Sequence, residues 1–192
     1  MRKILSVGLM LILVVGIVVG SLSNAFAGYR NSYNNNDDCV VVDGEIYELT
    51  TEQKEDLIFL YQEEKMARDL YLELADKWDA RVFSNIANSE EQHMSAVEVL
   101  LNKYDIEVPS LTTGEFANQK LAEQYDELLN KGLSSYEDAL EVAKTVEIVD
   151  IEDLEEMMVD ANPDAEIVFE NLKRGSENHL AAFNRQLEGE GR

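Results

Sequence analysis

Cysteine is almost missing from this sequence, because Cys39 is the only one among 192 residues. A lone cysteine cannot form a disulfide within the chain, and it excludes redox chemistry of the Cys-x-x-Cys type. In an exported protein its thiol is available for pairing with a second chain. The sequence also has no glycine-rich phosphate loop and no serine, histidine and aspartate arrangement, so nucleotide-binding and hydrolase functions lack support.

Basic residues are scarce as well. The chain has 16 Lys and Arg residues against 39 Asp and Glu residues, which gives a formal net charge of -23. Contacts with phosphate groups need Lys and Arg, so this balance argues against nucleic acid and against an anionic membrane surface as partners. We expect most acidic side chains to form a solvated surface, and only those on apolar helix faces to be informative.

The N-terminal segment, residues 1–27, has the three parts of a secretory signal peptide. Arg2 and Lys3 precede an apolar run over residues 4–20, and the segment ends in Ala-Phe-Ala. Cleavage there would place the mature protein outside the cytoplasm, as a secreted or cell-envelope protein. The alternative is an uncleaved membrane anchor, since the apolar run approaches the ~20 residues that span a bilayer. Residues 28–48 are polar and rich in asparagine, which predicts a disordered or extended tether.

Residues 49–188 have the three- and four-residue apolar spacing of amphipathic helices. Long helices are expected at residues 50–78, 81–104, 135–160 and 163–187, with a shorter helix at 115–130. The helix-start signals are Thr50 with Gln53, Ser134 with Glu137 and Asn162 with Pro163, and Gly189 is the expected end of the last helix. The first and last connections are short, and the long middle one carries the short helix. These features predict an all-α, ferritin-like four-helix bundle with a long crossover.

Each predicted long helix carries a ligand-type residue on its apolar face. These residues are Glu64, Glu90, His93, Glu147, Asp150 and His179. A polar group buried without partners costs roughly 2–7 kcal/mol, so each needs an ion pair, a hydrogen bond or a metal ion. Glu90 and His93 project from one side of their helix, as in the Glu-x-x-His pairs of helix-bundle metal sites. The alternative for the two histidines, the only ones in the chain, is hydrogen bonding within the core.

This set of donors indicates which metals to expect. Carboxylates with neutral imidazoles and without thiolates favour iron or manganese, with zinc as the alternative. We therefore expect metal ions as partners, one or two per chain.

Motifs on these helices resemble known families. Residues 64–71 resemble the first-helix motif of rubrerythrins, residues 89–93 their second-helix Glu-x-x-His, and residues 147–150 their third-helix Glu-x-x-Glu. The fourth helix departs from that pattern, because Ser176 stands where rubrerythrins carry a bridging carboxylate. The chain is more similar, over residues 49–187, to an uncharacterised ferritin-like family of prokaryotic proteins. That family shares the patterns Glu-Glu-Lys-x-Ala-Arg-Asp, Ser-Glu-x-x-His-Met and Gly-Ser-x-Asn-His-Leu.

The resemblance to rubrerythrins implies a site for two metal ions. It assigns Glu64 and His93 to one ion, Glu147 and His179 to the other, and Glu90 to a bridge between them. With Ser176 in place of the second bridge, either Asp150 substitutes for it or only one ion binds. Arg68 is expected to neutralise Glu64 in an ion pair. Tyr61 and Tyr71 are expected either to pack in the core or to donate hydrogen bonds to ligands.

Two functions of different classes follow. The first is a metal-dependent oxidase or peroxidase, in which iron or manganese supplies electrons to dioxygen or peroxide in oxidant defence or iron handling. The second is a non-catalytic exported bundle that stores or senses metal, or that retains the site as a polar core network. Ser176 is the residue that keeps the second function open. A homodimer is compatible with either.

Overall fold

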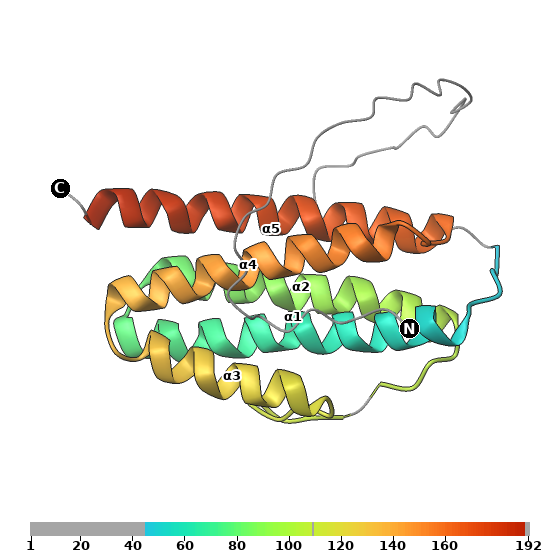
Figure 1. The fold of residues 1–192 in the computed structure, drawn as a ribbon, viewed down its shortest axis with the longest axis horizontal. Helices are drawn as coiled ribbons and strands as arrows, with labels where there is room; N and C mark the ends of the chain where they lie inside the picture. The colour runs from blue at the N-terminus through green and yellow to red at the C-terminus, as the bar shows by residue number, and fades with distance from the viewer. Residues whose placement is uncertain (1–44, 109, 191–192) are drawn as a thin grey trace, which may run out of the picture. The chain divides into compact units, whose positions relative to one another are not determined.

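The computed structural model describes residues 45–108 and 110–190, and all regular structure within these ranges is helical. The helices are α1 (Thr51–Trp78), α2 (Arg81–Lys103), α3 (Gln119–Gly132), α4 (Tyr136–Met158) and α5 (Pro163–Glu190) (Figure 1). The predicted all-α class is therefore confirmed. No helix in the described ranges is both long and apolar enough to cross a membrane. The predicted signal peptide, most of the tether and Cys39 lie outside the described residues.

The four long helices pack as two pairs that enclose one interior. α1 packs along α2, and α4 packs along α5 (Figure 1). α1 also contacts α4, and α2 also contacts α5. The two pairs therefore pack against each other and share one interior. α3 lies in the long connection between α2 and α4, and it packs against α1 and α4. The structure is thus a helical bundle whose long crossover carries a short extra helix, as predicted.

Side-chain caps fix where α1 and α5 begin. The Thr50 hydroxyl accepts a hydrogen bond from the amide of Gln53, and the Gln53 side chain accepts one from the amide of Thr50. This reciprocal pair confirms the predicted capping box. At the start of α5, Asn162 Oδ1 accepts from the amides of Asp164 and Ala165, so the predicted asparagine cap is also confirmed.

Two predicted helix boundaries are wrong by a small margin. The cap of α4 is Ser135 and not Ser134, because the Ser135 hydroxyl accepts from the amide of Asp138. α5 continues through Gly189 to Glu190. A glycine ends a helix when it adopts a left-handed conformation, and Gly189 does not adopt a positive φ.

The start of α3 also differs from the prediction, which placed it at residue 115. Gln62 on α1 accepts hydrogen bonds from the backbone amides of Ala117 and Asn118, and these bonds hold that stretch outside a helix. Asn118 then caps α3 by accepting from the first amides of the helix. A contact with a residue 55 positions away therefore decides this boundary.

Buried charges on α1 hold the rest of the crossover. Lys65 Nζ lies 2.5 Å from Asp69 Oδ2 and donates to the carbonyl of Thr112 at 2.8 Å. Asp69 in turn accepts from the amide of Gly114 at 2.9 Å. Gly114 has φ +77°, a conformation that favours glycine. α1 is consequently buried on two sides, one facing the other long helices and one facing the crossover.

The interior has a polar layer between two apolar clusters. The first cluster includes Leu70, Tyr71, Leu74, Phe83, Ile86, Leu140, Val146 and Phe183. The second includes Leu57, Leu60, Val97, Leu100, Leu154, Val168 and Leu172. Each long helix passes from one cluster to the other through a stretch that carries buried polar side chains. These polar side chains are therefore covered by apolar packing on both sides.

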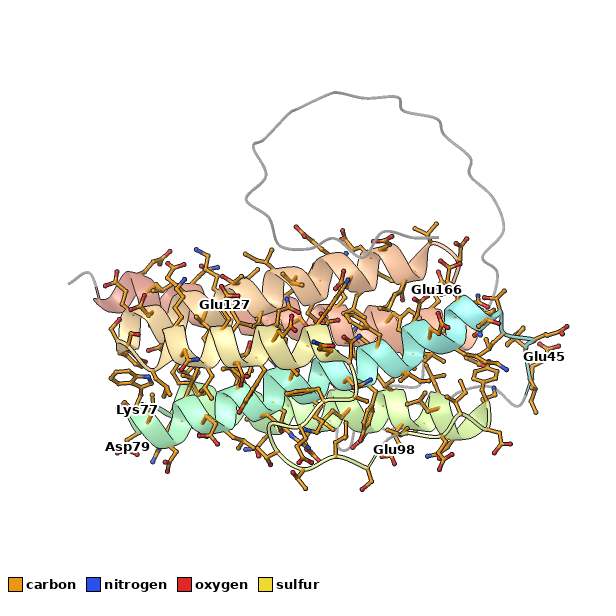
Figure 2. All side chains as sticks on the ribbon, turned by 60° about the horizontal axis from the view of Figure 1, so that its bottom comes forward. Glu45, Lys77, Asp79, Glu98, Glu127 and Glu166 are labelled. Carbon is orange, nitrogen blue, oxygen red and sulfur yellow. The ribbon has the colours of Figure 1, made fainter. Side chains whose placement is uncertain are left out.

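Much of the acidic surplus is on the outside of the bundle. Glu98 on α2, Glu127 on α3 and Glu166 on α5, which are labelled in Figure 2, are all exposed. The acids that enter the polar layer are a small and distinct subset.

Candidate metal centre

Five of the six predicted site residues come together in the polar layer. Two groups of three side chains have ligand atoms that all lie within 4.8 Å of one another. The first group is Glu64, Glu90 and His93, and the second is Glu90, Glu147 and His179. All five side chains are buried. Since they come from α1, α2, α4 and α5, all four long helices contribute.

Glu90 joins the two groups, because its two carboxylate oxygens face different histidines. Oε2 lies 2.8 Å from Nδ1 of His93, one turn further along α2. Oε1 lies 2.9 Å from Nδ1 of His179 on α5. The two imidazole rings are stacked, with centroids 5.4 Å apart. A carboxylate with one oxygen in each group has the arrangement of a ligand that bridges two metal ions.

Glu64 and Glu147 complete the two groups from α1 and α4. Nδ1 of His93 lies 3.2 Å from Glu64 Oε2, and Nδ1 of His179 lies 3.4 Å from Glu147 Oε2. Each Nδ1 thus faces one oxygen of the shared Glu90 and one oxygen of an outer carboxylate. At these separations, either a proton or a metal ion can lie between the histidine nitrogen and the carboxylate oxygens.

Hydrogen bonds with Ser89 and Tyr71, which lie next to the two groups, hold some of these side chains in place. Nε2 of His179 lies 2.9 Å from the Ser89 hydroxyl, and the Tyr71 hydroxyl donates to Glu147 Oε1 at 2.7 Å. Such partners orient metal ligands and select the tautomer of a histidine. Tyr71 therefore both packs in the core and donates a hydrogen bond to a candidate ligand. Tyr61 packs beside the second apolar cluster. The contact made by Ser89 was not expected.

Gly175 on α5 makes room for His93. A Cβ atom at position 175 would lie 2.4 Å from Nε2 and 2.7 Å from Cε1 of the imidazole. Any residue other than glycine would therefore push the His93 ring out of its present position. The sequence gives little sign of this requirement, beyond a glycine within a predicted helix.

Asp150, the sixth predicted residue, lies close by but belongs to neither group. Its side chain is buried, and neither carboxylate oxygen has a hydrogen-bond partner. Ser176 is a neighbour, but its hydroxyl donates to the carbonyl of Leu172. Glu64 Oε1 is also buried without a partner. Unpartnered buried oxygens are costly, so a proton or a cation is needed to compensate them.

Burial is the main influence on the pKa values of these carboxyl groups. It raises the pKa of Glu64 to about 7 and, together with the charge of Glu90, it raises the pKa of Glu147 to about 8. Burial would raise the pKa of Glu90 too, but the two nearby histidines outweigh it and lower that pKa to about 2. The shared carboxylate is therefore ionised, while the outer ones hold protons more readily.

The histidines show the opposite balance. Burial would lower the pKa of His179, but the nearby carboxylates of Glu147 and Glu90 raise it to about 10. Burial would likewise lower the pKa of His93, and the charge of Glu64 raises it well above its usual range instead. Both imidazoles therefore hold protons more readily than a free histidine does. A metal ion would displace these protons, because it needs neutral imidazoles and ionised carboxylates.

Arg68 does not pair with Glu64, so this prediction is wrong. Its guanidinium lies 2.7 Å from Asp69 Oδ1 and 2.5 Å from Glu91 Oε2, on a different side of α1. Among the ion pairs of residues 45–108 and 110–190, those of the clustered glutamates involve histidines only. The negative charge of the centre is therefore not offset by lysine or arginine.

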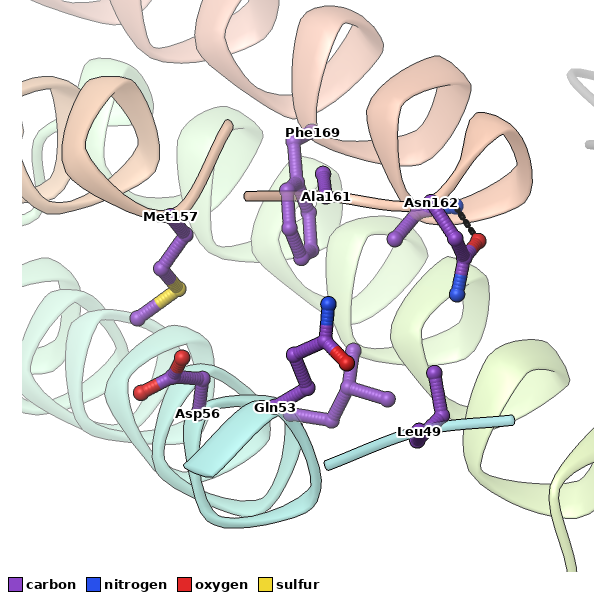
Figure 3. A pocket seen from close by; sticks show the side chains of 9 residues that line it. Leu49, Gln53, Asp56, Met157, Ala161, Asn162 and Phe169 are labelled. Atoms are coloured by element: carbon purple, nitrogen blue, oxygen red, sulfur yellow. Dashed lines mark hydrogen bonds between the residues drawn. The ribbon is translucent and has the colours of Figure 1, made fainter. Parts of the chain in front are cut away.

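A small cavity lies apart from these groups. Its volume is about 20 Å³, and Figure 3 shows Gln53, Asp56, Met157 and Phe169 around it. That volume accommodates about one water molecule. No member of either group lines the cavity, so it adds nothing to the candidate centre.

The family match covers every residue of this site. A family described as an uncharacterized protein domain, DUF2202, matches residues 53–192. The chain is 47% identical over 146 residues to the uncharacterized protein MJ0754 of Methanocaldococcus jannaschii, an alignment that covers 74% of this chain and 79% of that protein. It is also similar to the crystal structure of the hypothetical protein MJ0754 from Methanococcus jannaschii. There the TM-score is 0.76 at 44% identity, and the match covers 78% of this chain and 87% of that one. The chain therefore belongs to the DUF2202 domain family.

Proposed function

We propose that this chain is an exported ferritin-like metalloprotein that binds two ions of iron or manganese and reacts with dioxygen or peroxide. The proposed ligands are Glu64, Glu90, His93, Glu147 and His179, and Asp150 lies beside them. Protection against oxidants or oxidation of ferrous iron would be the resulting role. Zinc is the alternative metal, which would bind without redox chemistry.

The position of Glu90 carries this proposal. One side chain places an oxygen against His93 and the other oxygen against His179, and each histidine also faces a further carboxylate. A polar network that only stabilised the core would not need two equivalent triads around one carboxylate. The equivalence supports two positions of the same chemical kind.

The donor set and its charge fit a metal with a preference for oxygen and nitrogen ligands. Three carboxylates and two imidazoles are provided, without a thiolate. This composition favours iron or manganese over softer metals. Glu64 Oε1 and both carboxylate oxygens of Asp150 are buried without a hydrogen-bond partner, and a bound cation would compensate them.

The residues around the centre have separate tasks in this proposal. Bound iron or manganese would supply the electrons that reduce dioxygen or peroxide. Tyr71 orients Glu147, and Ser89 orients His179. Gly175 gives His93 the space to face Glu90. The apolar clusters on both sides of the polar layer keep bulk water away from the ligands.

A non-catalytic metal-binding bundle is the second candidate, and Ser176 favours it. Its side chain is fully buried and its hydroxyl donates to the carbonyl of Leu172, so it provides no second bridging carboxylate. A site with one bridge would hold its metals less tightly, or would hold only one. Consumption of dioxygen or peroxide by the metal-loaded protein separates the candidates, since only the first predicts turnover.

Export is part of the proposal and rests on residues 1–27 alone. We expect a mature chain that begins near Gly28, with an uncleaved membrane anchor as the alternative. Intact-mass measurement of the product in a cell-envelope fraction distinguishes them. A full-length chain in the soluble cytoplasm would contradict both.

Metal binding is tested by comparing two neighbouring glutamates on α2. Glu90→Ala removes an oxygen from each group, so we expect it to abolish binding of both ions. Glu91→Ala is the matched control, because Glu91 is exposed and pairs only with Arg68 among the ion pairs described. We expect this variant to bind metal almost as the wild type does.

Protein purified without chelator, then stripped and reloaded with Fe²⁺ or Mn²⁺ under nitrogen, provides the stoichiometry. Elemental analysis and equilibrium dialysis measure it for both variants. Equal stoichiometry in Glu90→Ala and wild type would rule out the proposed centre. A wild-type protein that binds neither ion would do the same.

A further inference from the structure

Four aromatic side chains form a continuous row from the metal centre to one end of the bundle. The ring centroids of Tyr71 and Phe83 are 6.4 Å apart, and those of Phe83 and Tyr136 are 6.2 Å apart. The centroid of Tyr136 in turn lies 6.1 Å from that of Trp78. All three separations are in the range of interacting aromatic pairs. Figure 1 shows that the end of α1 and the starts of α2 and α4, which carry the outer part of this aromatic row, lie at the same end of the bundle.

The two ends of the aromatic row differ in their surroundings. Tyr71 is fully buried, and its hydroxyl donates a hydrogen bond to Glu147 Oε1 at 2.7 Å. Tyr136 and Trp78 are only half-buried, and the indole N–H of Trp78 donates to the carbonyl of Gly132 at 3.0 Å. The aromatic row therefore joins a hydrogen-bond partner of a candidate metal ligand to a tryptophan that solvent reaches.

Three of the four rings are of the kinds that can be oxidised reversibly by one electron. Tyrosine and tryptophan have this property, and Trp78 is the only tryptophan in the chain. Phe83 lacks it, but its ring lies against both tyrosines and so provides the contact between them. Apolar packing alone would not need two phenols and an indole in succession.

We propose that the aromatic row is a path for single electrons between the metal centre and a small, soluble one-electron reductant at Trp78. The inference rests on the proposed function, because the centre is where the electrons are consumed. Reduction of one peroxide molecule to two water molecules takes two electrons and two protons. The reductant supplies the electrons one at a time through the aromatic row, and solvent supplies the protons.

Each transfer returns every residue of the aromatic row to its starting state. Tyr71 gives one electron to the centre, and its phenolic proton passes along the hydrogen bond to Glu147 Oε1. An electron that arrives from Trp78 through Tyr136 then restores Tyr71, which takes its proton back. Tyr136 and Trp78 release a proton to water when they are oxidised and regain one when they are reduced. The net change is one electron lost by the reductant and one gained at the centre.

The path can be measured without metal, by pulse radiolysis of the full chain in azide solution. Azide radicals oxidise tryptophan in preference to other side chains, so the single tryptophan gives a defined starting point. Transient absorption then follows conversion of the Trp78 radical into a tyrosyl radical. In the wild type we expect a first-order conversion whose rate does not depend on protein concentration.

The test variant is Tyr136→Phe, which should lose this first-order phase while keeping a ring at the same position. Tyr125→Phe is the matched control, because Tyr125 is also a tyrosine packed in the first apolar cluster, on α3. Its ring pairs with that of Phe116, outside the aromatic row. The control should therefore keep the phase at the wild-type rate.

A second measurement connects the aromatic row to the centre. Protein loaded with Fe²⁺ under nitrogen is mixed with hydrogen peroxide, frozen rapidly and examined by electron paramagnetic resonance. We expect a tyrosyl radical in the wild type that ascorbate removes quickly. Trp78→Phe, loaded to the same iron content by elemental analysis, should form the radical but lose it more slowly in ascorbate. A purely structural role for Trp78 would leave that decay unchanged.

A wild-type Trp78 radical that decays only by reaction between protein molecules would overturn the inference and leave the proposed centre intact. This measurement needs no substitution, so it decides even if a variant does not fold. Retention of the first-order phase in Tyr136→Phe, its loss in Tyr125→Phe, or equal decay in ascorbate of Trp78→Phe and wild type would overturn the inference too. A wild-type protein that binds no Fe²⁺ would instead overturn the proposed function, since the radiolysis does not depend on the centre.

Discussion

Replacing Gly175 with alanine should damage the metal centre through His93 alone. The new Cβ would lie 2.4 Å from Nε2, whereas ordinary contacts begin at 3.4 Å, so the ring must move by roughly 1 Å. His93 Nδ1 is now 2.8 Å from Glu90 Oε2, and a shift of that size would disturb this contact. Displacement of about 1 Å costs about 10²-fold in a positioned site. We therefore expect metal affinity to fall by about 100-fold.

The effect on stability should be smaller than the effect on binding, because a 100-fold loss of affinity corresponds to about 2.8 kcal/mol. Overpacking costs about 1–3 kcal/mol, while alanine in place of glycine within a helix gains about 1 kcal/mol. The expected net loss in the free energy of unfolding is therefore about 0–2 kcal/mol. Chemical unfolding in the presence of chelator measures it, and competition with a chromogenic chelator measures metal affinity.

Gly189→Ala is the matched control on the same helix, because a Cβ there meets no atom within 4 Å. It should leave metal affinity unchanged. Wild-type affinity in Gly175→Ala would refute the reasoning, since it would mean that the position of His93 does not matter for metal binding.

Two other predictions concern groups in and around the centre. Tyr71→Phe removes the hydrogen bond to Glu147, so metal affinity should fall by about 10–100-fold while the fold is retained. Unchanged affinity in the chelator competition would show that Tyr71 does not orient Glu147. The pH dependence of stability in chelator has a definite sign. Glu147 has a folded pKa of about 8 and His179 one of about 10, both above their unfolded values of about 4.3 and 6.5, so the folded state holds more protons. The free energy of unfolding should therefore fall as pH rises from about 5 to about 9, and excess metal should oppose that fall. Urea midpoints that rise over this pH range in the presence of chelator would contradict the raised pKa values of Glu147 and His179.

The sequence was sufficient for the helices and for the residues that gather at the centre. Three- and four-residue apolar spacing places one face of each long helix in the core, so polar residues on that face are expected to be buried too. The same logic brought Glu64, Glu90 and His179 together although they are far apart in the chain. Periodicity predicts which face is buried, and the bundle follows from packing those faces.

The burial of residues on a second face of α1 could not be predicted from this spacing. Gln62, Glu63 and Lys65 are off the main apolar face of α1, yet they are buried because the crossover and α4 cover that side. Helix periodicity has no information about such coverage, which depends on contacts between distant segments. For the same reason it gave Arg68 the wrong partner and missed the need for Gly175.

Anomalous diffraction from crystals loaded with Mn²⁺ or Fe²⁺ is the sharpest test of the bridging position of Glu90. The account predicts two anomalous peaks, one among Glu64, Glu90 and His93 and one among Glu90, Glu147 and His179. Each peak should lie within bonding distance of a different oxygen of Glu90. Peaks only at other places, or a single peak that leaves one histidine without metal, would contradict the account.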